Sequence, residues 1–137
     1  MGDVHDVALT ALFIDDETVV MQERDEHAPT SPNMFAFFGG AMELGESPEV
    51  AAARELREET TLVFEDNELR HMIDYPRPEN NGTMHLFMLK ISDDNFSVKE
   101  GRGKVVRRLV DVPLDTTADG SRLGAIYLYR LKEKGTS

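Results

Sequence analysis

The sequence predicts an α+β fold. Short apolar runs rich in β-branched and aromatic residues alternate with turn residues, as expected of strands, and one helical stretch interrupts them. A second helical stretch lies near the end of the sequence. A chain of 137 residues is long enough to bury roughly two-thirds of its unfolded surface without a disulfide. We therefore expect residues 1–137 to form a single α+β domain.

The charge of the chain limits its partners. The 15 basic and 26 acidic side chains give a formal net charge of −11. This charge repels the phosphate backbone of large nucleic acids, so we expect no such partner. A small nucleotide would be repelled in the same way unless bound cations supplied the attraction at its site.

The absence of cysteine from the sequence fits a reducing compartment. The sequence shows no charged-then-apolar leader and no run of about 18 apolar residues. We therefore expect a cytoplasmic protein with no membrane partner.

Two strands are predicted near the N-terminus. Residues 7–14 and 18–22 are apolar and rich in β-formers, and Asp15 and Asp16 between them favour a turn. The two segments are therefore expected to pair as a hairpin.

A loop and a third strand are predicted next. Residues 23–33 contain charges and two prolines without periodicity, which indicates a loop. Arg24, at its start, is expected on the surface. Residues 34–38 are predicted to form one strand, which delivers the chain to a tight turn at Gly39 and Gly40.

The start of the first helix is well marked, and the helix is predicted over residues 48–60. Ser47 can cap the first free amides, Pro48 suits the first helical position, and Glu49 places a negative charge in the first turn. Helical periodicity gives the helix an apolar side made of Val50, Ala52, Ala53 and Leu56.

Three carboxylates, from Glu55, Glu58 and Glu59, fall on another side of the same helix. Like charges at this spacing cost roughly 0.2–0.5 kcal/mol per pair, so something should compensate for them. An all-oxygen ligand set of high charge suits Mg2+ or Mn2+ better than zinc. On this hypothesis, Glu58→Gln relieves repulsion in the metal-free protein. The alternative is a solvated acidic helix face.

Further strands are predicted over residues 62–75 and 83–91, joined through a turn at residues 76–82, and over residues 104–110. His85 is expected to be a core or half-buried residue. The spacing of the four histidines is not typical of a metal site, so no chemistry is assigned to them: His5, His27, His71 and His85.

The closing helix is predicted over residues 117–134, with Gly135 as a stop signal. Its apolar stripe at helical spacing is interpreted as core. The stripe consists of Leu123, Ile126, Tyr127 and Leu131.

The stretch over residues 40–62 has a specific spacing. It reads Gly40, five residues, Glu46, seven residues, Arg54-Glu55-Leu56, one residue, Glu58-Glu59, one residue, Thr61-Leu62. This pattern closely resembles the Nudix box, and one fixed position departs from it, because Thr61 stands where the family has glycine. A β-branched residue is costly in a left-handed turn. We therefore predict a negative φ at Thr61 and a helix that ends differently from those of the family.

The resemblance implies a Nudix-like α/β/α sandwich, with a mixed sheet between helices. It also implies Mg2+-dependent (or Mn2+-dependent) hydrolysis of a diphosphate bond in a nucleoside diphosphate linked to another group. The implied metal ligands in the box are the Gly40 carbonyl and the carboxylates of Glu55, Glu58 and Glu59.

Three further residues acquire roles from the resemblance. Glu46 and Arg54 are expected to be architectural, with Arg54 orienting the catalytic carboxylates through a contact to the turn or to a glutamate. Glu100 is the candidate metal ligand outside the box, with Asp93 or Asp94 as alternatives. Glu55 is the first choice of general base and Glu100 the second.

The resemblance leaves the substrate open, because base recognition lies in variable loops. The candidates include nucleoside triphosphates, oxidised nucleotides, nucleotide sugars, ADP-ribose and dinucleoside polyphosphates. A competing hypothesis is a catalytically silent Nudix-like module that binds a nucleotide or a protein. The oligomeric state also stays open, a homodimer included.

Overall fold

The computed structural model describes residues 5–28, 31–77 and 82–134. Within these ranges, none of the helices has the length and apolar character needed to span a membrane. The elements in chain order are β1 (Val7–Asp15), β2 (Thr18–Glu23), β3 (Phe35–Ala36), β4 (Phe38–Ala41), α1 (Pro48–Glu59), η1 (Asp66–Glu68), β5 (Arg70–Pro76), β6 (Thr83–Lys90), β7 (Gly103–Arg108), η3 (Leu109–Asp111), η4 (Leu114–Thr116) and α2 (Asp119–Glu133).

The strands form one mixed sheet. Its main path runs β3-β2-β1-β6-β5, with β4 also paired to β1 and β7 to β2. The β1–β6 pair is parallel, whereas every other pair is antiparallel. The predicted hairpin of the first two strands is confirmed, and so is the strand predicted to begin at Thr83.

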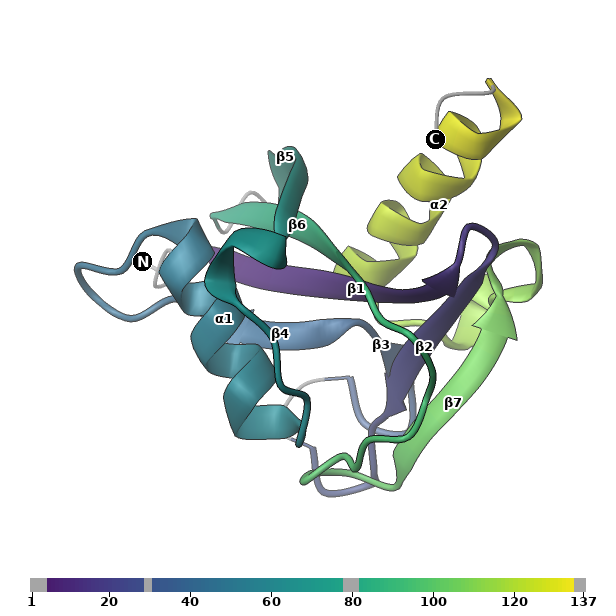
Figure 1. The fold of residues 1–137 in the computed structure, drawn as a ribbon, viewed down its shortest axis with the longest axis horizontal. Helices are drawn as coiled ribbons and strands as arrows, with labels where there is room; N and C mark the ends of the chain where they lie inside the picture. Colours follow the sequence, from purple (N-terminus) through teal and green to yellow (C-terminus); the bar gives the residue numbers. More distant parts are fainter. Residues whose placement is uncertain (1–4, 29–30, 78–81, 135–137) are drawn as a thin grey trace.

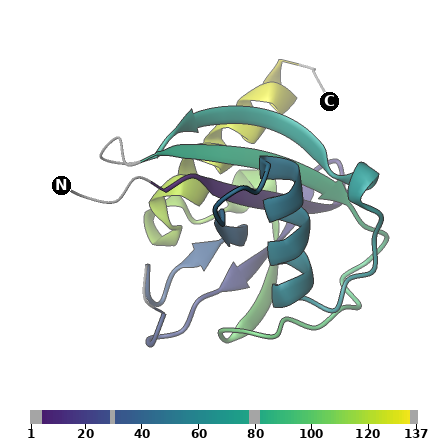
Figure 2. The same ribbon diagram turned by 90° about the vertical axis from the view of Figure 1, so that its left-hand side faces the viewer.

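The two helices cover opposite faces of the sheet (Figures 1 and 2). Alternation along β1 places Leu9 and Phe13 in the core cluster that contains Ala125 and Leu128 of α2. Leu12, on the other face, packs in the cluster that contains residues of α1. The predicted α/β/α arrangement is therefore confirmed.

The start of α1 is as predicted. Ser47 Oγ accepts the N–H of Val50 at 3.2 Å, and Pro48 takes the first helical position. The predicted apolar side is wrong at Val50, which is 53% exposed. Ala51 is buried in its place, because the face of α1 against the sheet is lined by alanines that allow close packing.

The predicted strand over residues 34–38 is divided in two. Phe37, between β3 and β4, donates its N–H to Ser121 Oγ at 3.0 Å instead of to a neighbouring strand. Strand β3 pairs with β2, whereas β4 pairs with β1. The tight turn expected at Gly39 and Gly40 is also wrong, since both glycines lie within β4 and pair with Leu9 and Ala8 of β1.

The predicted strand over residues 62–75 begins only at Arg70. The chain before it crosses the end of α1, where Arg57 donates to the carbonyl of Phe64 at 3.0 Å and pairs with Asp66 at 2.6 Å. The turn signal at Asn81 lies outside the described residues. The predicted strand over residues 104–110 is confirmed as β7, which ends at Arg108.

The apolar stripe predicted for the closing helix is wrong at Leu123, which is 46% exposed, whereas Tyr127 packs against the core as predicted. The fully buried residues of α2 are instead Ser121, Gly124, Ala125 and Leu128. Small residues face the sheet because the helix packs closely: a Cβ on Gly124 would lie 3.0 Å from the Tyr75 hydroxyl. The stop signal at Gly135 lies outside the described residues.

Gly39 permits the close pairing of β4 with β1. Its φ is +151°, and a Cβ there would lie 2.0 Å from the carbonyl oxygen of Ala8. Gly39→Ala should therefore lower the free energy of unfolding by at least about 3 kcal/mol, measured by urea denaturation.

Gly45→Ala is the matched control for this prediction. Gly45 has a φ of +84°, and a Cβ on it would have no described atom within 4 Å, so only backbone strain opposes alanine. We expect a loss of about 1–2 kcal/mol at Gly45. Equal losses in the two variants would show that steric contact with β1 is unimportant.

Candidate active site

The carboxylates of α1 lie directly against β4. Glu59 is 5% exposed, and its Oε1 accepts the N–H of Gly39 at 2.8 Å. A Cβ on Gly40 would lie 2.9 Å from the carboxylate carbon and both carboxylate oxygens of Glu55. Gly40 is therefore required by the approach of the Glu55 carboxylate to the strand backbone.

Arg54 connects the acidic groups of the loop and the helix. Its Nε and Nη2 donate to the two carboxylate oxygens of Glu46 at 2.6 and 2.9 Å. Its Nη1 lies 3.0 Å from an oxygen of Glu55 and 3.0 Å from an oxygen of Glu58. Its Nη2 also donates to the carbonyl of Ala41 at 3.2 Å, at the end of β4.

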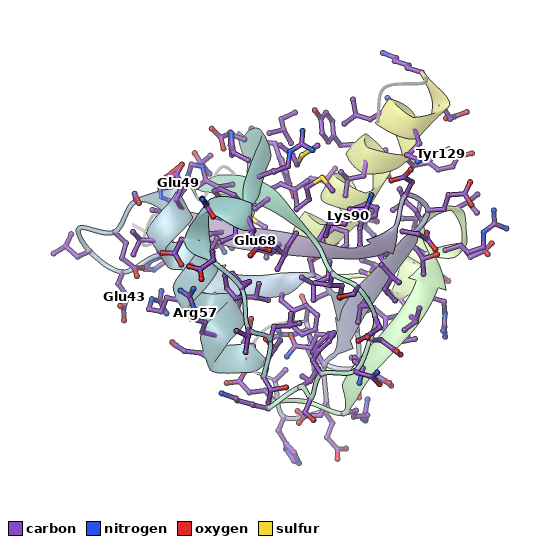
Figure 3. The ribbon with its side chains drawn as sticks, viewed as in Figure 1. Glu43, Glu49, Arg57, Glu68, Lys90 and Tyr129 are labelled. Carbon is purple, nitrogen blue, oxygen red and sulfur yellow. The ribbon has the colours of Figure 1, made fainter. Side chains whose placement is uncertain are left out.

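Figure 3 places Glu43 on the loop that precedes α1, and a carboxylate oxygen of Glu43 lies 3.4 Å from Arg54 Nε. A hydrogen bond within the loop also stabilises it: the N–H of Glu43 donates to Glu46 Oε1 at 2.7 Å. Arg54 therefore contacts both the loop and two helix glutamates, which are the contacts expected of an architectural arginine.

The bidentate Arg54 contact lowers the pKa of Glu46 to about 2 and raises the pKa of Arg54. Arg54 is also the compensation that the acidic helix face requires. Glu58 forms an ion pair with Arg54, and its side chain is 50% exposed. Glu58→Gln would therefore break an ion pair, and the expectation that this substitution relieves repulsion is wrong. The poorly compensated carboxylate is that of Glu59.

Burial is the main cause of the pKa shifts at the inner carboxylates. It raises the pKa of Glu59 to about 8, with added repulsion from Glu55 and Glu100, against the opposing effects of the Gly39 N–H and Arg24. Burial also raises the pKa of Glu55, opposed by Arg54 and reinforced by Glu58 and Glu100. The site thus holds Glu55 and Glu59 close together where burial disfavours their charged forms.

Glu100 is brought to this site by the segment before it. Lys99 donates its N–H to the carbonyl of Glu59 at 2.8 Å, and Val98 forms a bridge with Thr60. The charge of Glu100 accordingly acts on Glu55 and Glu59. Asp93 lies instead beside a separate cavity with Leu62, Phe64 and Phe96.

Thr61 fixes that segment to the end of α1. Its N–H donates to the carbonyl of Ser97 at 3.0 Å, and its Oγ1 accepts the N–H of Ser97 at 2.8 Å. The non-glycine residues with positive φ within the described ranges are Ser31 and Asn33, so the predicted negative φ at Thr61 is confirmed. Unlike glycine, threonine supplies a hydroxyl that holds the segment leading to Glu100.

Two residues of the site were missed by the sequence reasoning. Arg24 is half-buried rather than on the open surface, and its charge acts on Glu59. Gln22 is 3% exposed, and its Oε1 is a buried side-chain oxygen without a partner among the described residues. Gln22 could have been noticed in the sequence, because it is a polar residue at the end of the apolar run of β2. Both residues line a hollow with Glu100.

A larger cavity of about 380 Å³ adjoins β4. Its wall includes Gly39 and Gly40, and apolar side chains such as Phe37 and Met84 line it. Arg24 and Arg77 contribute positive charge. The cavity therefore offers an apolar wall and cationic groups next to the carboxylates.

The residues present fit a hard divalent cation. The donors around Glu55, Glu58, Glu59 and Glu100 are all oxygens, and Gly40 leaves room for close approach because it has no side chain. Mg2+ and Mn2+ prefer such oxygen donors, whereas a soft or nitrogen-preferring metal would not.

Residues 4–115 match the family model described as NUDIX domain. The match covers most of the sequence, and it includes the box, β4 and α1. The chain belongs to the Nudix family. None of the curated proteins matches this sequence significantly.

Solved structures confirm the Nudix fold. A NUDIX hydrolase from Nitrosomonas europaea is similar with a TM-score of 0.71 and 18% identity, over 97% of this chain and 74% of that one. A mutT/nudix family protein from Listeria innocua gives 0.70 and 15%, over 100% of both chains.

A longer protein contains the same Nudix fold. It is a bifunctional NMN adenylyltransferase/ADP ribose pyrophosphatase from Francisella tularensis, complexed with AMP and a manganese ion. The TM-score is 0.72 at 14% identity, over 95% of this chain and 42% of that one. This chain therefore spans about two-fifths of the length of the Francisella protein.

The raised pKa of Glu59 predicts a pH-dependent stability in the metal-free protein. Between about pH 4.5 and pH 8, the folded state retains a proton that the unfolded state has released. The contribution of Glu59 therefore makes the free energy of unfolding fall as pH rises through this window, by on the order of 3 kcal/mol, and level off above it.

Glu59→Gln tests this effect, because the amide oxygen can still accept the Gly39 N–H. In urea denaturation with EDTA, wild type should lose more stability than Glu59→Gln between pH 5 and pH 8. Parallel pH profiles for the two proteins would contradict the raised pKa.

Proposed function

We propose that this protein is a Mg2+-dependent Nudix pyrophosphohydrolase that cleaves a diphosphate bond in a nucleoside diphosphate linked to another group. The single observation that supports this most strongly is the set of helix carboxylates against β4. Arg54 holds two of them, and Glu100 approaches from outside the helix.

Residues of the box would hold the metal. Glu55, Glu58 and Glu59 would supply carboxylate oxygens, the Gly40 carbonyl a further oxygen, and Glu100 a ligand from the far side. When bound, Mg2+ or Mn2+ would screen the diphosphate and lower the pKa of an attacking water. Arg54 would keep two of the carboxylates in position through its contacts to Glu46 and Ala41.

Glu55 is the first choice of general base and Glu100 the second. Glu55 lies at the centre of the acidic group, with 17% of its side chain exposed. One of its oxygens is engaged by Arg54, which would leave the other to take a proton from water. Glu100 is more exposed and is placed by the backbone contact of Lys99 with Glu59.

The cavity beside β4 would receive the nucleoside part of the substrate. Its apolar residues suit a base, and Arg24 and Arg77 suit phosphate oxygens. The AMP in the Francisella structure is compatible with a nucleotide ligand. The proposed substrate class is therefore a nucleoside triphosphate, an oxidised nucleotide or a nucleotide sugar.

The proposed location of the protein is a reducing compartment such as the cytoplasm.

The function is tested by phosphate or pyrophosphate release from a panel of these nucleotides with and without Mg2+. Wild type should hydrolyse at least one nucleotide, and only with a divalent cation. Glu55→Gln and Glu58→Gln should each lower kcat/KM by at least about 100-fold.

Glu49→Gln is the matched control, because Glu49 lies in the first turn of the same helix and is exposed. It should retain wild-type activity. No hydrolysis of any nucleotide by the folded wild type would favour a catalytically silent binding module instead.

A second test concerns the ligand outside the helix. Glu100→Gln should raise the Mg2+ concentration for half-maximal activity by about 10-fold, because one metal oxygen is lost while the helix glutamates remain. Asp94→Asn should leave that concentration unchanged. The assignment fails if Glu100→Gln follows the wild-type Mg2+ titration, or if Asp94→Asn shows the larger shift.

A further inference from the structure

Two histidines and an aspartate meet on the outer strands of the sheet. His71 Nε2 lies 2.6 Å from Asp74 Oδ1, and His85 Nδ1 lies 2.7 Å from the same oxygen. The three ligand atoms all lie within 4.8 Å of one another. The residues come from β5 and β6, which run side by side at one edge of the sheet in Figures 1 and 2.

The strand pairing explains why they meet. Asp74 is directly opposite His85, and His71 is opposite Phe87, so all four side chains lie on one face. An irregularity between His71 and Ile73 inserts an extra residue, which brings His71 and Asp74 to the same face. The sheet backbone therefore holds three potential ligands in a fixed arrangement.

The histidine rings are also oriented by their neighbours. The His71 ring packs edge to face against Phe87, with 5.3 Å between ring centroids. The second ring nitrogen of His85, Nε2, lies 3.8 Å from Asp6 Oδ2, while Asp6 Oδ1 accepts the N–H of Thr83 at 3.0 Å. The 3.8 Å separation is longer than a hydrogen bond, but it leaves a carboxylate beside the second ring nitrogen, where such a group usually supports a metal-bound histidine.

Access to the cluster is open. The side chains of His71 and Asp74 are 44% and 48% exposed, whereas that of His85 is 13% exposed. An ion could therefore enter from solvent, and water could complete its coordination.

From these contacts we propose that His71, Asp74 and His85 form a binding site for a divalent transition metal of the Zn2+ class. Two imidazole nitrogens and one carboxylate oxygen are a donor set that Zn2+ accepts in tetrahedral geometry, with water in the fourth position. The same set is poor for Mg2+, which requires oxygen donors in an octahedron. The metal would replace the hydrogen bonds at Asp74 Oδ1 and link β5 to β6.

The proposed site is distinct from the acidic site of α1. His85 lies on β6, two strand spacings from β4, whereas His71 and Asp74 lie on β5, three spacings away, which corresponds to about 10 and about 14 Å. Its donors also differ in kind from the all-oxygen set of the box. The inference therefore stands whether or not the proposed hydrolysis is correct.

The test is a calorimetric titration of the whole protein with Zn2+, in the presence of excess Mg2+ added to compete for the carboxylates of α1. Wild type should bind one Zn2+ per chain. His71→Ala and Asp74→Asn should weaken that binding by at least about 100-fold, and Asp6→Asn by about 10- to 100-fold. Co2+ in place of Zn2+ should give the visible absorption of a four-coordinate nitrogen and oxygen site, and His71→Ala should remove it.

His27→Ala is the matched control, because His27 is an exposed histidine outside β5 and β6. It should bind Zn2+ as wild type does, and circular dichroism should show that every variant is folded. Absence of Zn2+ binding in wild type, or equal binding in wild type, His71→Ala and Asp74→Asn, would overturn the proposal. The cluster would then be a hydrogen-bonded link between two strands.

Discussion

The ion-pair network of Arg54 is the constraint on which the acidic site depends. A helix that carries Glu55, Glu58 and Glu59 on one side is unfavourable by itself, because the carboxylates repel one another. Arg54 offsets this repulsion at Glu55 and Glu58 through Nη1. The same guanidinium binds the carboxylate of Glu46 in a bidentate manner, through Nε and Nη2. A lysine could not reproduce these contacts, because its ammonium is a single point charge.

The rest of the fold sets the position of this network. Gly40 lets β4 approach α1 so closely that Glu55 lies against the strand, and the N–H of Gly39 donates to Glu59. Thr61 holds the segment that leads to Glu100 through two hydrogen bonds with Ser97. Charged side chains from three separate stretches of chain are therefore held close together by rigid elements, which is the arrangement that a preorganised site requires.

Local signals in the sequence were sufficient for some features. Ser47 and Pro48 predicted where α1 begins, and the apolar runs around Asp15 and Asp16 predicted the first hairpin. Helical periodicity predicted one side of α1 for the carboxylates of Glu55, Glu58 and Glu59. These features depend on neighbours within a few residues, so a single sequence contains the information.

Other features depended on contacts between distant residues. Gly39 and Gly40 were expected in a turn, but pairing with β1 places them in a strand. The buried face of α2 includes small residues such as Gly124, because Phe37, Tyr75 and Leu86 leave no room there for a larger one. His71 and His85 are 14 positions apart in sequence, and only the register of β5 against β6, with its irregularity, brings both to Asp74.

The central claim, that the box glutamates form a divalent cation site, is tested most directly by anomalous diffraction from crystals of the protein soaked in Mn2+. The account predicts an anomalous peak within about 2.1–2.3 Å of oxygens from at least two of Glu55, Glu58 and Glu59. A further contact should come from the Gly40 carbonyl or from Glu100. Strong peaks elsewhere, with none beside α1, would contradict the account.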